Sequence, residues 1–219
     1  MNAPKHLTLR ERIYDEIVRM IVSGELPSGA ALDERALTER LAVSRTPFRE
    51  AIGTLGREGL VEIRPYRGFY VRTFTAKEIE DLYELRKTLE SMAARLAVQR
   101  MTEADIDRFA AMLDEGVAAL QRRDMALYAD RDREFHQTIA RLSDNLALIE
   151  TLGRLDLQIQ ICRLVANESD DFARRAAQER DRILQAFRAR DAEAAARLMH
   201  EHIADVQSAV MARFGGEGG

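Results

Sequence analysis

The segment from Val43 to Leu60 constrains the fold more than any other part of the chain. Ser44 is a favourable helix N-cap, and Pro47 falls in the first helical turn, where its missing N–H is harmless. Apolar residues then recur at helical spacing, and a glycine follows where the helix should end: Phe48, Ile52, Leu55 and Gly59. Arg45 and Arg49 lie four residues apart, so both cations project from one side of the helix near its N-terminus. Such a first turn is suited to guanine edges and phosphates.

Two further helices are predicted before this one. Apolar residues at helical spacing mark the first: Leu9, Ile13, Ile17, Met20 and Ile21. The run 24–29 (GELPSG) then forms a turn, and Asp33 can cap a second helix. The apolar residues of that helix are Ala36, Leu37 and Leu41. Because only a short turn separates the second helix from the third, the pattern predicts a helix-turn-helix.

A β-hairpin is predicted directly after the third helix. Alternating β-forming residues at 61–64 and 69–72 flank the Pro/Gly-containing turn 65–68. The tip, Arg67-Gly68, places a cation where the backbone can approach a duplex closely. A helix-turn-helix followed by such a hairpin is a winged helix. The alternative is an ordinary helix–hairpin domain with solvated arginines, which is less favoured because turn chemistry, helix order and cation placement all agree.

The pattern changes at Thr75, after which the chain is expected to be all-α. It has no proline beyond Pro65, is rich in Ala, Leu, Arg and Glu, and shows no strand-like alternation. We expect helices at 76–100, from Thr102 onward, and at roughly 124–142, 145–166, 170–190 and 191–213. The predicted fold is therefore mainly α: a winged-helix domain at 1–74, an antiparallel six-helix bundle at 75–214, and a disordered tail at 215–219.

Composition restricts the compartment and the partners. No apolar run is long enough to span a membrane, and the single cysteine, Cys162, suits a reducing cytoplasm. The net charge of −4 is unevenly divided. Residues 1–74 hold 12 Lys and Arg against 10 Asp and Glu, and residues 75–219 hold 21 against 27. A mildly basic domain on an acidic one is typical of a small DNA-binding module joined to a second domain of another role.

Residues 9–72 resemble the winged-helix domain of the GntR family. The features that carry the resemblance are GELPSG (24–29), LDERAL (32–37), VSRTPFREA (43–51) and GLV (59–61). Residues 76–213 resemble the FCD effector domain of the FadR-like branch through ELR (84–86) with Glu90, DREFH (132–136), ILQAF (183–187), and Met199 with His202. Six helices rather than seven favour the VanR-like subgroup.

The resemblance implies which side chains contact DNA. Arg35, Arg45 and Arg49 correspond to DNA-contacting positions, with Ser44, Thr46 and Gly68 in supporting places, and the tip residue Arg67 suits the minor groove or the backbone. The alternative is that these arginines pair with Glu34, Glu50 or Glu58. DNA contact is favoured for Arg45 and Arg49, whereas the two interpretations are closely balanced for Arg35 and Arg67.

Asp132 and His136, four residues apart on one helix face, form half of a metal site or merely a surface hydrogen bond. The FCD pattern adds two histidines, and here His202 stands at one position while Arg180 stands at the other. Either Asp132, His136 and His202 hold Zn, Ni or Mn with solvent or an effector completing the shell, or Arg180 replaces the metal. In the second interpretation, slightly preferred, Arg180 pairs with Asp132 and binds an acidic effector directly.

Arg86 is the remaining candidate for the effector site. Its helix is rich in apolar residues, so we expect its neighbours to face the bundle interior. A buried arginine needs an anion, and Glu90 at i+4 is one candidate. An effector carboxylate is the other, and both stay open.

The sequence therefore predicts a ligand-responsive transcription regulator rather than an enzyme. A homodimer would bind a palindromic operator, and a small organic acid would relieve repression. One rival is a metal-dependent hydrolase using Asp132, His136 and His202, which lacks an evident general base and leaves the winged helix unexplained. Another is an architectural DNA binder without sequence preference, for which the acidic helical domain has no evident use.

Overall fold

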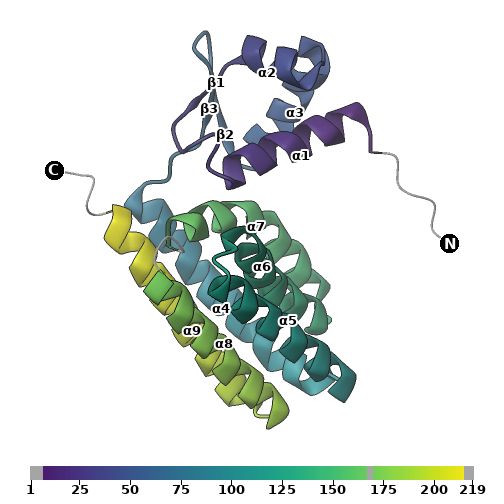
Figure 1. The fold of residues 1–219 in the computed structure, drawn as a ribbon, viewed down its shortest axis with the longest axis vertical. Coiled ribbons are helices and arrows are strands. Elements are labelled where there is room, and N and C mark those ends of the chain that lie inside the picture. The colour runs from purple at the N-terminus through teal and green to yellow at the C-terminus, as the bar shows by residue number, and fades with distance from the viewer. Residues whose placement is uncertain (1–6, 167–169, 215–219) are drawn as a thin grey trace. The chain divides into compact units, whose positions relative to one another are not determined.

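The computed structural model describes residues 7–166 and 170–214, and the predicted tail at 215–219 lies outside them. The chain divides into two compact units, Met1–Phe74 and Thr75–Gly219. The first combines three helices with a small sheet and the second is entirely helical in its described part (Figure 1). This confirms the mainly helical fold with a winged helix-turn-helix followed by a helical domain. Within the described ranges, no helix is both long enough and apolar enough to cross a membrane.

The first unit contains the three predicted helices, α1 (Leu9–Val22), α2 (Glu34–Leu41) and α3 (Arg45–Arg57). Asp33 caps α2 as expected, because its carboxylate accepts the backbone N–H groups of Arg35 and Ala36 at 2.9 and 3.0 Å. The helices pack their apolar faces together around side chains that are almost fully buried: Ile13, Ile17, Met20, Phe48, Ala51, Ile52 and Leu55. This core holds α3 in place while its N-terminal turn remains exposed.

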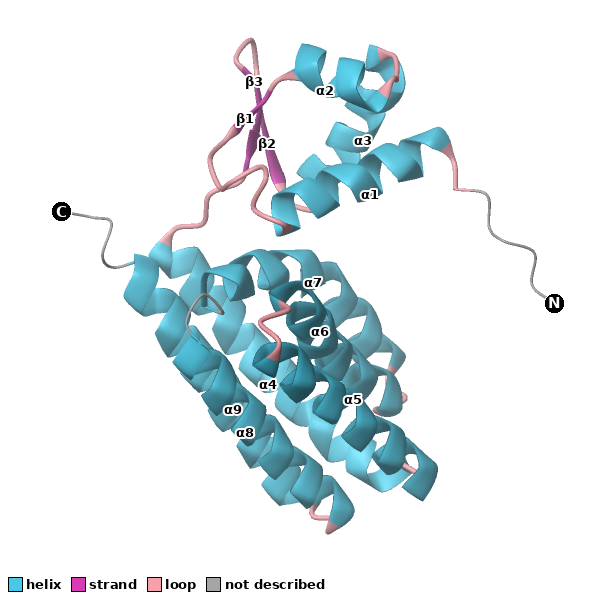
Figure 2. Ribbon diagram, viewed as in Figure 1, coloured by secondary structure: helices cyan, strands magenta, loops and turns pink. Residues whose placement is uncertain are grey.

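The sheet of the first unit has three antiparallel strands in the order β1-β3-β2 (Figure 2). The predicted hairpin is formed by β2 (Val61–Arg64) and β3 (Gly68–Val71), with Arg64 opposite Gly68. Strand β1 (Ala31–Leu32) was not predicted. It is only two residues long, so its sequence carries no period-two pattern, and its existence depends on the pairing with β3.

The described part of the second unit contains six helices, as predicted. They are α4 (Ala76–Arg100), α5 (Glu103–Gln121), α6 (Met125–Leu142), α7 (Leu146–Ala166), α8 (Asp170–Arg188) and α9 (Ala192–Phe214). The side chains of Thr75 and Thr102 accept the N–H groups of Glu78 and Asp105, so a capping box starts both α4 and α5. Helix α4 packs against α6, α7 and α9, with its most extensive contact along α9.

The burial of α4 differs in part from the expectation that the neighbours of Arg86 face the bundle interior. Leu85, next to Arg86, is 44% exposed, and Met92 is 46% exposed. Arg86 and Glu90 are instead buried. Because neighbouring helices cover most of α4, the buried surface includes the polar positions and leaves a narrow outer face that carries these two apolar side chains. The helix thus directs ionisable groups into the bundle.

Candidate nucleic-acid and effector sites

The N-terminus of α3 presents free backbone N–H groups. Ser44 occupies the N-cap position with an extended backbone, but its side chain makes no capping hydrogen bond to the described residues. The N-cap position predicted for Ser44 is thus confirmed, but it is formed by the backbone alone. An N-cap side chain accepts from the second or third helical N–H, and the third residue here is Pro47, which has none. The first turn consequently keeps donors that an anion can use.

The predicted DNA-contacting arginines are all exposed, and two of them pair with carboxylates. Arg49 donates to Glu34 from Nε at 2.8 Å and from Nη2 at 3.0 Å, with 61% of its side chain exposed. Arg35 pairs with Glu39 at 2.9 Å. Within residues 7–166 and 170–214, Arg45 has no ion-pair partner, and neighbouring Thr46 is exposed. The alternative pairing with Glu34 thus exists for Arg49, but exposed ion pairs exchange partners at little cost.

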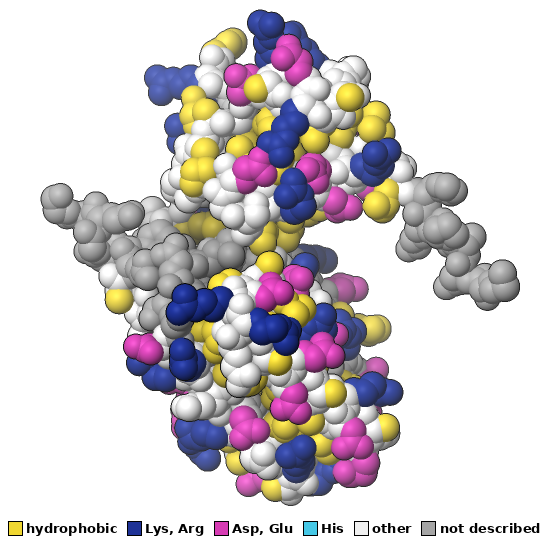
Figure 3. All heavy atoms as spheres, viewed as in Figure 1, with side chains coloured by type: hydrophobic (Ala, Val, Ile, Leu, Met, Phe, Trp, Pro, Cys, Tyr) yellow, Lys and Arg dark blue, Asp and Glu magenta, His cyan; other side chains and the backbone are white. Residues whose placement is uncertain are grey.

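The hairpin tip is equally exposed. Arg67 and Gly68 lie on the surface, and Arg67 has no ion-pair partner among the described residues. The Arg67 N–H donates to the Arg64 carbonyl at 3.0 Å, which closes a turn with Pro65 and Tyr66 in its centre. Tyr66 has φ 62° and is fully exposed. In Figure 3 the Lys and Arg side chains of the visible face are interspersed with Asp and Glu rather than merged into one basic surface.

The second unit contains a buried polar cluster contributed by α4, α6, α8 and α9. Arg86 is 0% exposed and donates from Nε to Glu90 at 2.6 Å. His136 lies between the same two side chains, with Nδ1 against the Glu90 carboxylate and Nε2 at 3.2 Å from Arg86 Nη2. Because a guanidinium can only donate, Nε2 accepts and Nδ1–H donates to Glu90. Arg86 thus forms an ion pair with Glu90, which was one of its two predicted partners. Its Nη1 is buried without a hydrogen-bond partner among the described residues.

Arg180 forms the second ion pair of the cluster and is 3% exposed. Its Nη1 donates to Asp132, its Nη2 donates to the Tyr128 hydroxyl at 2.7 Å, and its Nε donates to the Ala176 carbonyl at 3.2 Å. Although burial alone would lower it, the pKa of Arg180 is raised by Asp132 and Tyr128. The pairing with Asp132 is the one predicted from sequence. Three of its five N–H groups thus donate to the protein, which leaves one N–H on Nη1 and one on Nη2 for a further acceptor.

His202 is 1% exposed on α9 and is held by Glu179 of α8. Its Nδ1 lies 2.7 Å from the Glu179 carboxylate, to which Nδ1–H donates, so Nε2 keeps a lone pair. No described residue bonds to that nitrogen. Burial lowers the pKa of His202, and Arg180 lowers it further against the opposing bond to Glu179. The ring is therefore neutral at pH 7. His200, two residues earlier, is exposed, as expected of a surface histidine.

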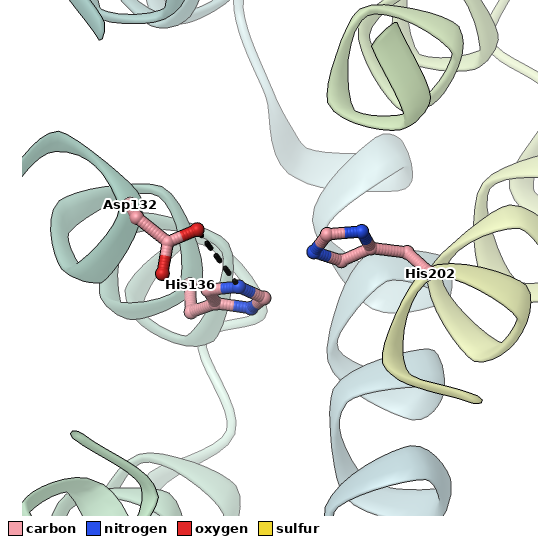
Figure 4. Close-up of side chains that lie close together, drawn as sticks. All are labelled: Asp132, His136 and His202. Carbon is pink, nitrogen blue, oxygen red and sulfur yellow. Dashed lines mark ion pairs between the residues drawn. The ribbon is translucent and has the colours of Figure 1, made fainter. Parts of the chain in front are cut away.

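The predicted metal-ligating residues come together in space. Asp132, His136 and His202 each offer one ligand atom, and these atoms lie within 4.8 Å of one another. Figure 4 shows the His202 ring directed from α9 toward the other two residues on α6. The Asp132 carboxylate is 3.9 Å from His136 Nε2, and the two imidazole rings stack with centroids 5.5 Å apart. All three predicted ligands thus converge, but Arg180 and Arg86 contact the atoms that a metal would need.

A cavity of about 220 Å³ adjoins this cluster. Glu90 and His136 form part of its wall, and the rest comes from α6 and α7: Gln137, Ala140, Arg141, Ile149, Leu152, Gly153, Asp156 and Ile159. Asp156 is held in place by Arg133, Gln137 and Gln160. The lining is mainly apolar with a few fixed polar groups, which is typical of a small-molecule site. Arg86, Arg180 and His202 do not line it.

Sequence reasoning missed several residues that shape these sites. Tyr128 and Glu179 orient Arg180 and His202 but carry no motif signal, because each acts across helices distant in sequence. The α7 residues of the cavity wall were also missed. Apolar residues are spread around all sides of α7, so their spacing does not reveal which side borders a cavity. Tyr66, next to the predicted Arg67, could have been noticed as an aromatic residue in a Pro/Gly turn.

Comparison with known proteins gives two family matches. Residues 9–71 match the family described as bacterial regulatory proteins, gntR family, and residues 81–205 match the FCD domain. The HTH-type transcriptional repressor RspR of Escherichia coli is 26% identical over 92% of this chain and 89% of its own. The Nta operon transcriptional regulator of Aminobacter aminovorans is 35% identical over 67% of this chain and 69% of its own. The E. coli McbR/YncC structure, 23% identical, superposes with a TM-score of 0.83 over 95% of this chain and 99% of its own.

Proposed function

Since the chain belongs to the GntR family of bacterial regulatory proteins and carries an FCD domain, it is a DNA-binding transcription regulator, and we propose that it is a cytoplasmic homodimeric repressor released by a small metabolite. Residues 1–74 would bind DNA, and residues 75–214 would bind the effector and form the dimer. A GntR domain paired with an FCD domain fits the FadR-like branch. Membership of the VanR-like subgroup stays a prediction.

The observation that carries the proposal is that the N-terminal turn of α3 and the hairpin tip are both exposed. Arg45 and Arg49 can reach base edges and phosphates, and Arg67 adds a cation at the hairpin. Selection of bound DNA from a random pool by the full chain tests this directly. We expect enriched sequences with two inverted half-sites, because a two-fold symmetric dimer presents two copies of α3. Equal affinity for enriched and scrambled DNA would instead indicate an architectural binder.

Dimerisation is supported by the outer face of α4. Leu85 and Met92, seven residues apart and therefore on one side of the helix, expose apolar side chains that a second copy could cover. Sedimentation of the full chain should show a dimer. Leu85→Glu together with Met92→Glu should produce monomers that keep their helical content. Val117→Glu together with Leu146→Glu, at exposed apolar positions of α5 and α7, is the matched control for added charge.

An effector is proposed to bind in the cavity beside Glu90 and His136. Gly153 allows a matched test, because a Cβ built at this position meets no described heavy atom within 4 Å. Gly153→Leu should fill the cavity, leave operator binding intact and abolish release by the effector. Gly153→Ala gains the same helix propensity, about 1 kcal/mol, but leaves most of the cavity open and should respond as wild type. Equal responses of both variants would place the effector elsewhere.

The chemical class of the effector stays a prediction from sequence, which favours an organic acid. In the cavity wall the carboxylates Glu90 and Asp156 are already paired with Arg86 and Arg133. Arg141 lines the wall and donates to the Thr138 hydroxyl rather than to a carboxylate, so its charge could bind an acidic effector. Release of the selected DNA by a panel of small acids and their matched amides would distinguish a charged effector from a neutral one. The comparisons lend no support to a metal-dependent hydrolase at Asp132, His136 and His202.

A further inference from the structure

The buried cluster fits a metal ion poorly, despite the convergence of three ligating side chains. A divalent ion needs the Asp132 oxygen and the two Nε2 atoms as electron-pair donors. The Asp132 oxygen Oδ1 instead accepts from Arg180, and Nε2 of His136 lies 3.2 Å from Arg86 Nη2. Only the Nε2 atom of His202 is without a partner among the described residues. Metal binding would therefore have to displace the Arg86 contact with His136 and would bring the ion against the Arg180 guanidinium at Asp132.

The charges of the cluster are already close to balance. Two guanidiniums, Arg86 and Arg180, face two carboxylates, Glu90 and Asp132, in one-to-one pairs, and Glu179 beside His202 adds a further carboxylate. Arginine cannot release its proton to make room for a second cation. An added divalent ion would leave the buried cluster with excess positive charge, which a low-dielectric interior disfavours strongly. The donor set is thus occupied by an internal cation.

We propose that Arg180 is this built-in cation, that it takes the place of a metal ion, and that one substitution at residue 180 would convert the cluster into a metal site. Its guanidinium reaches Asp132 from α8, as a ligand from that helix would. Tyr128 and the Ala176 carbonyl fix its orientation, and its burial keeps water from replacing Asp132. Metal content is measured without effector, so this proposal stands or falls independently of the effector response.

Purified full-length wild type and Arg180→His should be compared by elemental analysis and by calorimetric titration with Zn²⁺, Ni²⁺ and Mn²⁺. We expect no stoichiometric ion in the wild type. R180H frees Asp132, adds an imidazole and leaves only the Arg86 contact with His136 to be displaced. It should therefore bind a stoichiometric ion and unfold at a higher temperature when that ion is present. Adding His202→Ala to R180H should remove most of this binding, because one of the four ligands is lost.

Arg182→His, at an exposed position of the same helix, controls for a new surface histidine and should gain no site. A stoichiometric metal in the wild type would overturn the proposal and needs no variant to fold. A folded R180H that binds no metal, or binds it equally without His202, would overturn it as well. Circular dichroism of each variant establishes that it is folded.

A second, independent observation concerns Tyr66 at the hairpin tip. A turn with proline in its first central position and positive φ in the second favours glycine or asparagine at that second position, yet Tyr66 occupies it with φ 62°. The ring is also fully exposed, so no described contact offsets the strain. A bulky residue in this backbone region is a genuine outlier, and such strain is concentrated at functional sites. We infer that the Tyr66 ring contacts the sugar–phosphate edge of the operator beside Arg67.

Tyr66→Asn tests this inference because asparagine tolerates positive φ. Thermal unfolding of the full chain should move to higher temperature, whereas affinity for the selected DNA should fall several-fold. The slope of log K against log salt should not change, since no charge is lost. Tyr66→Phe keeps the ring and should bind as wild type, and Arg67→Ala should make the slope shallower. Unchanged affinity of Y66N, or reduced stability, would overturn the inference.

Discussion

Arg49 in α3 and Arg180 in α8 each pair with one carboxylate, but they do so in opposite surroundings. Arg49 bonds Glu34 with 61% of its side chain exposed, whereas Arg180 bonds Asp132 with 4% exposed. Water can replace Glu34 with little loss, so the Arg49 guanidinium is available to a phosphate or a guanine. Nothing comparable can replace Asp132. Arginine therefore has two roles in this chain. Arg49 can exchange its carboxylate partner for DNA, whereas Arg180 neutralises a buried carboxylate.

The two regions also differ in how their geometry is fixed. The exposed arginines of α3 are positioned by the apolar core beneath the helix, which does not depend on their own partners. In the bundle, the charged groups are themselves part of the core, and the hydrogen bonds among them determine the tautomers of His136 and His202. Removing one partner should consequently have small structural effects in α3 and large ones in the bundle.

Asp132→Ala should give the largest effect on stability. The substitution leaves Arg180 buried without its carboxylate, which typically costs about 3–5 kcal/mol in the free energy of unfolding. Urea unfolding of the full chain, followed by circular dichroism, measures this cost for the helical unit. Asp130→Ala, at an exposed position of α6, should change it by less than about 0.5 kcal/mol. A loss at Asp132 as small as that at Asp130 would remove the contrast between the two regions.

Arg49→Ala, in contrast to Asp132→Ala, should weaken DNA binding while leaving stability almost unchanged. Affinity for the selected DNA should weaken by about 1–3 kcal/mol, the usual value of a specific arginine contact. Stability should be nearly unchanged, since the pair with Glu34 is exposed. Arg57→Ala, at the other end of α3, is the matched control and should leave affinity unchanged. Unaltered affinity in a mobility-shift assay of R49A would contradict the assignment of α3 as the DNA-reading helix.

Much of the fold followed from the sequence because its signals are local. Capping residues such as Asp33 and Thr102 fix helix starts, and apolar spacing fixes which face is buried. The exceptions needed tertiary information. Strand β1 exists only through its pairing with β3, and Leu85 is exposed because neighbouring helices bury the other faces of α4.

The candidate sites divide in the same way. The positions of Arg45, Arg49 and the hairpin tip could be predicted, since each lies within a contiguous motif. The convergence of Asp132, His136 and His202 came from the family resemblance, because helix packing, not spacing, brings α6 and α9 together. The Glu90–His136 contact and the cavity along α7 could not be predicted, as they depend on side-chain packing between helices distant in sequence.

Glu34→Gln sharpens the comparison with a smaller effect. If Glu34 competes with DNA for Arg49, removing its charge should strengthen operator binding by about 0.5–1 kcal/mol, the scale of an exposed ion pair. Fluorescence anisotropy with the selected DNA at moderate salt is precise enough for this difference. Glu39→Gln, which releases Arg35 instead, provides the parallel measurement. Weaker binding of E34Q would show that the pair orients Arg49 rather than occupying it.

The smallest expected effect is a change in the pH dependence of stability at His202. Its pKa is lowered in the folded protein by burial and by Arg180, so between that lowered value and about 6.5 the unfolded chain binds the extra proton. Stability therefore rises with pH in this interval and is lost as the pH falls below about 6.5. Asp205, whose pKa is raised by burial and by Glu179, contributes in the opposite direction. Unfolding midpoints of His202→Gln should depend less on pH between 5 and 7 than those of the wild type. An unchanged dependence would mean that His202 has the same pKa in the folded and the unfolded chain. Burial in the cluster would then affect its charge as little as solvent exposure affects that of Arg49.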